Sequence, residues 1–109
     1  MMDDLYEKFR PQFVELARVR IERAKEALAA RPEHAAMTVV IREFHSITGE
    51  AGLLGLPHVM GLARQTEDLA KRFRDSGSAA DADALAGAIR DLKTALELVG
   101  ASSKPGGGA

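Results

Sequence analysis

Apolar residues recur every three or four positions in four separate segments of the chain, which is the spacing of one face of an α-helix. The first segment, which Asp3 or Asp4 could cap, carries Phe9, Phe13, Leu16, Ala17, Ala24 and Leu28. The second carries Met37, Val40, Ile41, Phe44, Ile47, Ala51 and Leu54. The third carries Val59, Leu62, Ala63, Thr66, Leu69, Ala70 and Phe73. The fourth carries Leu85, Ala88, Ile89, Leu92, Ala95, Leu96 and Val99. Each segment therefore predicts an amphipathic helix with a single apolar stripe.

Proline and glycine mark the ends of these predicted helices. Pro11 predicts a junction between a short N-terminal helix and a longer one, and Pro32 can open the second long helix. Gly55 and Pro57 predict a helix end that is followed directly by a helix start. Gly77 predicts the end of the third helix. The connections between the helices are therefore expected to be short.

Four amphipathic helices with short connections are typical of an antiparallel, up-and-down four-helix bundle. We therefore predict one all-α domain over residues 1–100, with the short additional helix at its N-terminus. The fourth helix is expected to end at Gly100. Residues 101–109, "ASSKPGGGA", offer no core residue and are expected to form a flexible tail or linker.

The charge balance narrows the classes of partner. The 109 residues include 15 Lys and Arg and 16 Asp and Glu, for a net charge of −1, so neither nucleic acid nor a membrane is expected as a partner. The absence of cysteine excludes disulfides and thiolate metal sites. No apolar run approaches the roughly 20 residues needed to cross a bilayer, and the acidic N-terminus does not resemble a signal peptide. We therefore expect a cytoplasmic protein.

Arg20 lies near the edge of the first apolar stripe, and its guanidinium group is expected to be solvated.

The second helix holds a histidine beside two glycines, in "FHSITGEAGLLGLP". At about 100° per residue, His45 lies on the border between the apolar stripe and solvent, and Gly49 and Gly52 follow it on the same surface row. Each glycine weakens a helix interior by about 1 kcal/mol relative to alanine. In return the two glycines leave a clear approach to the imidazole and room for the backbone of another protein.

Three kinds of chemistry use an accessible imidazole. Metal binding is disfavoured, and no metal site is expected, because no ligand-type residue lies three or four positions after His45. Neither His34 nor His58 has a spacing that would join it. Hydrolysis by a nucleophile–base pair is disfavoured because Ser46 points about 100° away on a helix. The remaining candidate is a histidine that itself accepts and passes on a chemical group.

The stretch "HSITGEAGLLGLP" resembles the signature of histidine phosphotransfer (HPt) domains, and is similar to the phosphotransfer domain of chemotaxis-type histidine kinases. That signature has the form H-x-[small or apolar]-K-G-x-[AS]-x-x-[LF]-G. The positions that match it are His45, Gly49, Ala51, Leu54 and Gly55. Helix lengths and apolar pattern agree with the family over nearly the whole chain, from the opening "DDLYEKF" to Val99.

The resemblance implies a fold and a role. The histidine would lie on the second helix of a four-helix bundle and would carry a phosphoryl group on Nε2. It would exchange that group with an aspartate of a response-regulator receiver domain, or accept it from a sensor histidine kinase. Mg²⁺ would be bound by the receiver, so no cofactor is expected on this chain, and its sequence has no Gly-rich phosphate loop for ATP. The protein would then be a phosphoryl carrier in a two-component phosphorelay rather than an enzyme.

One position departs from the family pattern where a charge is expected. The family usually has a lysine three residues after the histidine, close to the phosphoryl group, and here that residue is Thr48. Threonine can donate a hydrogen bond but does not offset the charge of about −1.5 to −2 that a phosphate carries at neutral pH. Glu50 also replaces a residue that is usually small, although it points away from His45. The missing lysine leaves a second interpretation open, an HPt-like interaction module that binds a receiver or a kinase without phosphotransfer.

The third helix carries a polar row that could complete the site. In the chemotaxis-type domains a glutamate 22 residues after the histidine bonds its Nδ1, and Glu67 has that spacing from His45. Arg64 could contact the phosphoryl oxygens in place of the missing lysine. Arg42 and Lys71 are further candidate cations. The alternative is a solvated helix face with an i, i+4 ion pair.

A partner would need a docking surface around His45. The candidates for this surface are Arg42, Gly49, Gly52, Leu53, Leu56, Met60 and Lys71. The sequence thus predicts a phosphorelay carrier in which His45 accepts the phosphoryl group and Glu67 orients the ring. Thr48 and Arg64 complete the predicted site.

Overall fold

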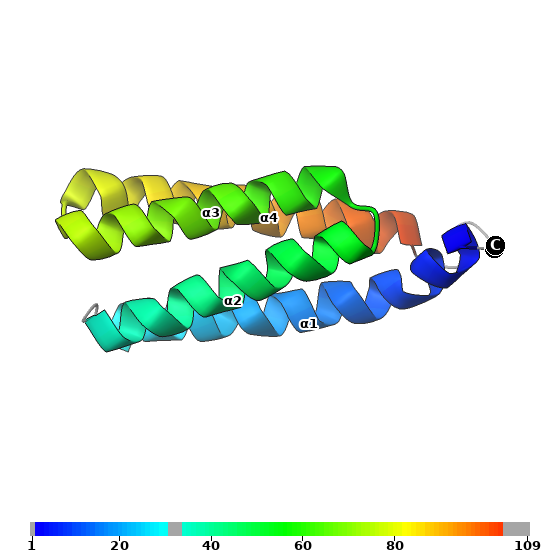
Figure 1. Ribbon diagram of the computed structural model, residues 1–109, viewed down its shortest axis with the longest axis horizontal. Helices are drawn as coiled ribbons and strands as arrows, with labels where there is room; N and C mark the ends of the chain where they lie inside the picture. Colours follow the sequence, from blue (N-terminus) through cyan, green and yellow to red (C-terminus); the bar gives the residue numbers. More distant parts are fainter. Residues whose placement is uncertain (1, 31–33, 104–109) are drawn as a thin grey trace.

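The computed structural model describes residues 2–30 and 34–103, and these residues form four long helices. The helices are α1 (Met2–Ala30), α2 (His34–Leu53), α3 (Pro57–Ser76) and α4 (Ala79–Ser103). No strand occurs within the described ranges. Figure 1 shows the four helices lying lengthwise, with the chain reversing direction from each helix to the next. Both α1 and α3 pack against α2 and α4, so the helices enclose one core.

α1 is one continuous helix, so the expectation of a separate short helix before Pro11 is wrong. Pro11 lies inside α1, where it removes the backbone N–H that would otherwise donate to the carbonyl group of Glu7. Both residues are exposed, so water can bond to the freed carbonyl group and the helix continues. Pro32, expected to open the second helix, lies outside the described residues.

The C-terminal helix runs further than the sequence pattern indicates. α4 continues through Gly100 to Ser103, so Gly100 does not end it. A Cβ atom at this glycine would lie 3.4 Å from Val14 Cγ1 of α1. Gly100 therefore serves the close approach of two helices rather than a helix end. Of the predicted tail, residues 101–103 are helical and residues 104–109 lie outside the described part.

The glycines at the other two helix ends behave as predicted. Gly55 has φ of 67° and Gly77 has φ of 61°, a left-handed conformation that favours glycine. The N–H of Leu56 donates to the carbonyl oxygen of Ala51 at 2.9 Å, and that of Gly55 donates to Gly52 at 3.3 Å. This pair of bonds is a Schellman motif. Pro57 then begins α3 directly, so the α2–α3 turn is tight.

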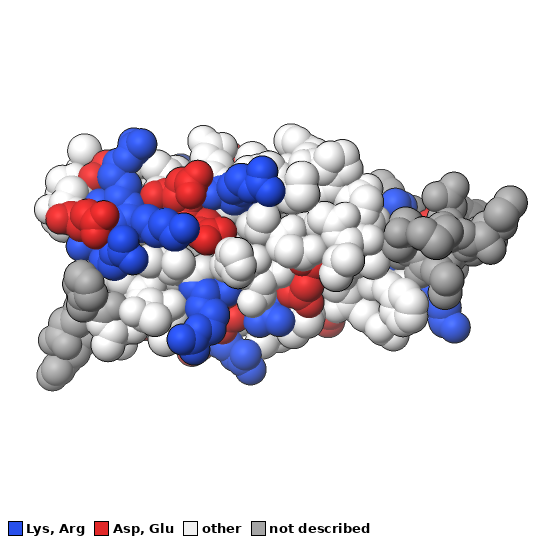
Figure 2. All heavy atoms as spheres, viewed as in Figure 1, with Lys and Arg blue, Asp and Glu red and all other residues white. Residues whose placement is uncertain are grey.

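The surface formed by α2 and α3 is unevenly charged. Figure 2 shows side chains of both signs gathered toward the end where α3 finishes, whereas the middle of this face and the part toward the α2–α3 turn are largely uncharged. Among the described residues, no helix has both the length and the apolar character needed to span a membrane.

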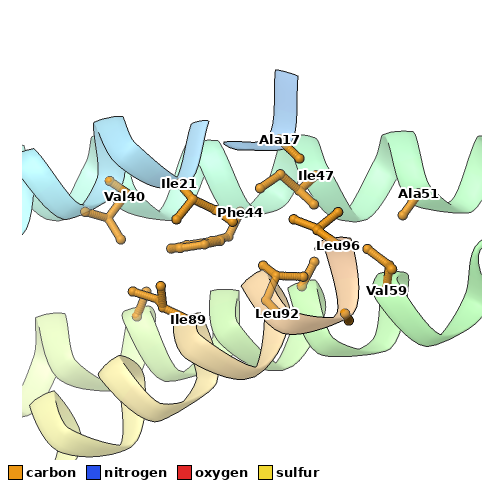
Figure 3. Packing of buried hydrophobic residues seen from close by; sticks show 14 of the residues in the cluster. Ala17, Ile21, Val40, Phe44, Ile47, Ala51, Val59, Ile89, Leu92 and Leu96 are labelled. Atoms are coloured by element: carbon orange, nitrogen blue, oxygen red, sulfur yellow. The ribbon is translucent and has the colours of Figure 1, made fainter. Parts of the chain in front are cut away.

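The core is one apolar cluster to which all four helices contribute. Its largest fully buried side chains include Ile21, Met37, Phe44, Ile47, Leu85, Leu92 and Leu96. Figure 3 shows Phe44 and Ile47 of α2 pointing into the space between the helices, toward which Leu92 and Leu96 of α4 also point. Burial of Phe44 and Ile47 fixes the rotation of α2, and with it the direction in which His45 projects, about 100° around the helix from Phe44.

The predicted stripe of α1 is rotated relative to the buried face. Phe9 and Leu16, expected in the core, are 44% and 39% exposed. Val14 and Ile21, which the stripe omitted, are 5% and 1% exposed. Both sets have helical spacing, and packing against α2 and α4 selects the second one. The face that is buried follows Phe13, Val14, Ala17, Ile21 and Ala24.

Arg20 does not place its charge in water as expected. Its Nη1 atom lies 2.9 Å from Glu43 Oε1, and its Nε atom lies 3.1 Å from Glu50 Oε1. Arg23 approaches the same Glu43 carboxylate at 3.9 Å. Glu43 is 8% exposed, and a carboxylate at such depth needs a paired cation. These ion pairs join α1 to α2 on a side away from His45, and they account for the unusual Glu50.

We expect that Arg20→Met lowers the free energy of unfolding by about 1–3 kcal/mol, because Glu43 keeps its charge but loses its closest partner. Urea unfolding followed by far-UV circular dichroism measures this. Arg18→Met is the matched control, since Arg18 and Glu15 are both exposed and 3.9 Å apart, and its effect should stay within about 0.5 kcal/mol. The double variant Arg20→Met/Glu43→Met should recover most of the loss, and an additive loss would contradict the pairing.

Candidate functional site

His45 projects from the middle of α2 into solvent. Its side chain is 75% exposed, whereas Phe44 before it and Ile47 after it are both fully buried. Burial of these two neighbours fixes the rotation of α2 about its axis, so the imidazole has only limited freedom to turn toward the core. The ring is therefore accessible to a second protein while its backbone is fixed by the core.

One carboxylate from α3 contacts the ring. His45 Nδ1 lies 3.2 Å from Glu67 Oε2 and 3.3 Å from Glu67 Oε1. The side chain of Glu67 is only 9% exposed, so its position is set by its surroundings. A carboxylate can only accept hydrogen bonds. In the neutral ring the proton then resides on Nδ1 and donates to Glu67, and the lone pair of Nε2 stays free on the exposed side.

The pairing of these residues follows from the register of the two helices. A Cβ atom at Gly52 would lie 3.1 Å from the Sδ atom of Met60. The number of residues from His45 forward to Gly52 on α2 equals the number from Glu67 back to Met60 on α3, as expected for antiparallel neighbours. The same register holds at both contacts, so other facing residues can be assigned from it.

Lys71 completes an ion pair with the same carboxylate. Its Nζ atom lies 3.2 Å from Glu67 Oε2, one turn further along α3. Lys71 was predicted as a candidate cation and docking residue, with an i, i+4 ion pair as the alternative, and the structure shows this ion pair. Glu67 Oε2 is therefore shared by two donors, the ring of His45 and the ammonium group of Lys71.

Thr48 is placed differently from the expectation. It is 8% exposed, and its Oγ1 atom donates to the carbonyl oxygen of Phe44 at 2.8 Å. Its hydroxyl proton is thus used within α2, a common bond for threonine in a helix. Nothing in this arrangement directs the hydroxyl group toward the exposed side of His45.

Arg64 lies across from the position of Thr48. Thr48 is three residues after His45 on α2, and Arg64 is three residues before Glu67 on α3, so the antiparallel register brings them opposite each other. Arg64 is exposed. Within the described ranges, neither it nor the exposed Arg42 has a hydrogen-bond or ion-pair partner. Arg64 therefore offers a free guanidinium group close to where the family's lysine would stand.

The two glycines beside His45 meet different surroundings. A Cβ atom at Gly49 would find no atom within 4 Å, so this position is open to solvent or to a partner. At Gly52 the same atom would press against Met60. Gly49 fits the predicted open approach, whereas a side chain at position 52 would require Met60 of α3 to shift.

The remaining predicted docking residues lie toward the α2–α3 turn. Leu53 is 75% exposed, and Leu56 and Met60 are partly buried against the core. All three lie in or beside the α2–α3 turn. Among the described residues, no group of three or more His, Cys, Asp or Glu side chains could hold a metal ion.

Comparison with known families gives a match that spans most of the chain. Residues 8–102 match the family described as "Hpt domain". This range contains the exposed histidine, the carboxylate that contacts it, α2 and α3, and most of α1 and α4. No curated protein and no solved structure gives a significant match. Domains of this family are phosphoryl carriers of phosphorelay signalling rather than enzymes, and this chain belongs to the Hpt domain family.

Proposed function

We propose that this protein carries a phosphoryl group on Nε2 of His45 and exchanges it with an aspartate of a response-regulator receiver domain. The observation that supports this most directly is the contact of His45 Nδ1 with Glu67 at 3.2 Å on an otherwise exposed ring. That contact leaves Nε2 as the free nucleophile. A purely structural histidine would not need both its exposure and its held tautomer.

The transfer step uses the atoms that the site presents. The Nε2 lone pair attacks the phosphorus atom of the aspartyl phosphate, and an N–P bond forms. The P–O bond to the aspartate breaks, and the aspartate leaves as a carboxylate. Nδ1 keeps its proton, so the ring gains positive charge, which the Glu67 carboxylate beside it stabilises.

Positioning and electrostatics dominate such a step, because phosphoryl transfer passes through a loose transition state with charge on the equatorial oxygens. The receiver brings the aspartate and Mg²⁺. This chain brings an accessible imidazole and, in our proposal, the guanidinium of Arg64 in place of the family's lysine. Arg64 acts from α3, next to the side of α2 where Gly49 leaves open space.

The partner docks on the face around His45. Gly49 allows its backbone to come close, and Leu53, Leu56 and Met60 provide apolar contacts. A sensor histidine kinase is the second expected partner, as the source or the destination of the phosphoryl group. Both partners are expected in the cytoplasm, and neither requires a cofactor on this chain.

A second candidate function is an interaction module that binds a receiver or kinase without phosphotransfer. The buried threonine at position 48 favours it, because α2 then has no cation where the family usually has a lysine. The preserved contact between His45 and Glu67 favours the carrier, since binding alone does not require a held imidazole tautomer. The two functions differ in whether His45 is ever phosphorylated.

Phosphoryl uptake separates these functions. The protein is incubated with phosphoramidate and, separately, with a phosphorylated receiver domain, and its intact mass is followed. We expect a gain of one acid-labile phosphoryl group that is absent from the control His45→Gln. Binding of a receiver with no mass gain from any donor would replace the carrier with the interaction module.

The role of Glu67 is tested by Glu67→Ala. Loss of the acceptor should release the Nδ1–H tautomer, which the ¹⁵N chemical shifts of the His45 ring report. Uptake from phosphoramidate should fall about ten- to a hundredfold, the size expected for losing a charge-assisted hydrogen bond. Asp68→Ala is the control, because Asp68 is the exposed neighbour on the same helix. Unchanged ring shifts in Glu67→Ala would rule out the orienting role.

The role of Arg64 is tested by Arg64→Met, which should lower transfer from a phosphorylated receiver roughly three- to tenfold. Arg42→Met removes the same charge from an equally unpaired side chain on the other side of His45 and should have less effect. Adding Thr48→Lys to Arg64→Met should restore transfer, because the cation returns to α2. Equal loss in both arginine variants would indicate a general effect of net charge.

A further inference from the structure

The carboxylate that contacts His45 has a second partner that the transfer step does not use. Glu67 Oε2 lies 3.2 Å from His45 Nδ1 and 3.2 Å from Lys71 Nζ. The side chain of Glu67 is 9% exposed, whereas that of Lys71 is 46% exposed. The three groups therefore form a line from the solvent-exposed lysine, through a nearly buried carboxylate, to the exposed ring.

We infer that Lys71 is a positioning residue for phosphoryl transfer, which acts on His45 through Glu67 rather than on the partner or the phosphoryl group. This inference rests on the proposed function of His45. Lys71 holds Oε2 in place and offsets part of the negative charge that Glu67 presents to the ring. It thereby keeps the acceptor in place for Nδ1–H, so that the lone pair stays on Nε2.

The direction of the effect follows from the position of the carboxylate. Without Lys71, Oε2 loses one of its two partners, and the Glu67 side chain is freer to turn away from Nδ1. A smaller share of the rings then holds its proton on Nδ1 with the lone pair on Nε2. Loss of Lys71 therefore makes transfer slower.

The charged side chains around this ring belong to α2 and α3. Arg42 lies one turn before His45 on α2, and Arg64, Glu67 and Lys71 lie on α3. Among them, only Glu67 has a contact with the ring within the described residues, and only Lys71 has a contact with Glu67 besides the ring. A change at Lys71 thus reaches His45 by one route.

The test compares Lys71→Met with Arg72→Met, which removes the same charge from the neighbouring exposed position of α3. In Lys71→Met we expect the ¹⁵N shifts of the His45 ring to move away from those of the Nδ1–H tautomer. Uptake from phosphoramidate should fall about two- to tenfold, in line with the loss of one partly exposed ion pair. Arg72→Met should change neither. Lys71→Arg should restore both, because a guanidinium can also donate to Glu67.

Phosphoramidate is the informative donor because it needs no docking surface. If Lys71 contacted a partner instead, Lys71→Met would slow transfer from a phosphorylated receiver and leave both phosphoramidate uptake and the ring shifts unchanged, which would overturn the inference. If the wild-type protein accepted no phosphoryl group from either donor, the proposed function would fail. The ring shifts of the two variants would still show whether Lys71 acts on His45.

Discussion

The packing of α3 against α2 sets which residues of the two helices face each other, and each contact of the site follows from it. Small side chains allow the approach: Ala51, Ala63 and Ala70 are fully buried between the helices. Gly52 leaves just enough room for Met60. A shift by one residue would rotate Glu67 by about 100° away from His45. The apolar interior thus specifies the polar contact on its surface.

The site combines one exposed side chain with one buried side chain. The ring of His45 is 75% exposed, whereas the carboxylate that contacts it is 9% exposed. Burial makes an unpaired carboxylate costly, so Glu67 keeps its partners, His45 and Lys71, and holds its place. An exposed acceptor would be free to turn into water. The reactive ring can therefore stay open to a partner and still present a defined nitrogen.

Sequence reasoning was strongest where a residue's role depends on local geometry. Gly55 and Pro57 marked a turn because their backbone preferences are local. The spacing of His45 and Glu67 came from the family resemblance, and the structure brings the two side chains together. The pairing of Arg20 with Glu43 was missed because α1 has two stripes of helical spacing, and only packing against its neighbours selects one. Interhelix partners cannot be derived from one helix alone.

Thr48 and Arg64 suggest how a family pattern can change without losing its chemistry. Position 48 is nearly buried, and its hydroxyl group is bonded within α2, whereas position 64 across the helix interface is exposed. A cation at position 64 then lies on the same helix as Glu67, about one turn away from it. Proton control and phosphate contact would both come from α3, and both would depend on the register of α3 against α2. Under the proposed function, the positive charge would then stand on the facing helix, and the interface between the two helices would matter more for the reaction than in a site whose cation stands beside the histidine.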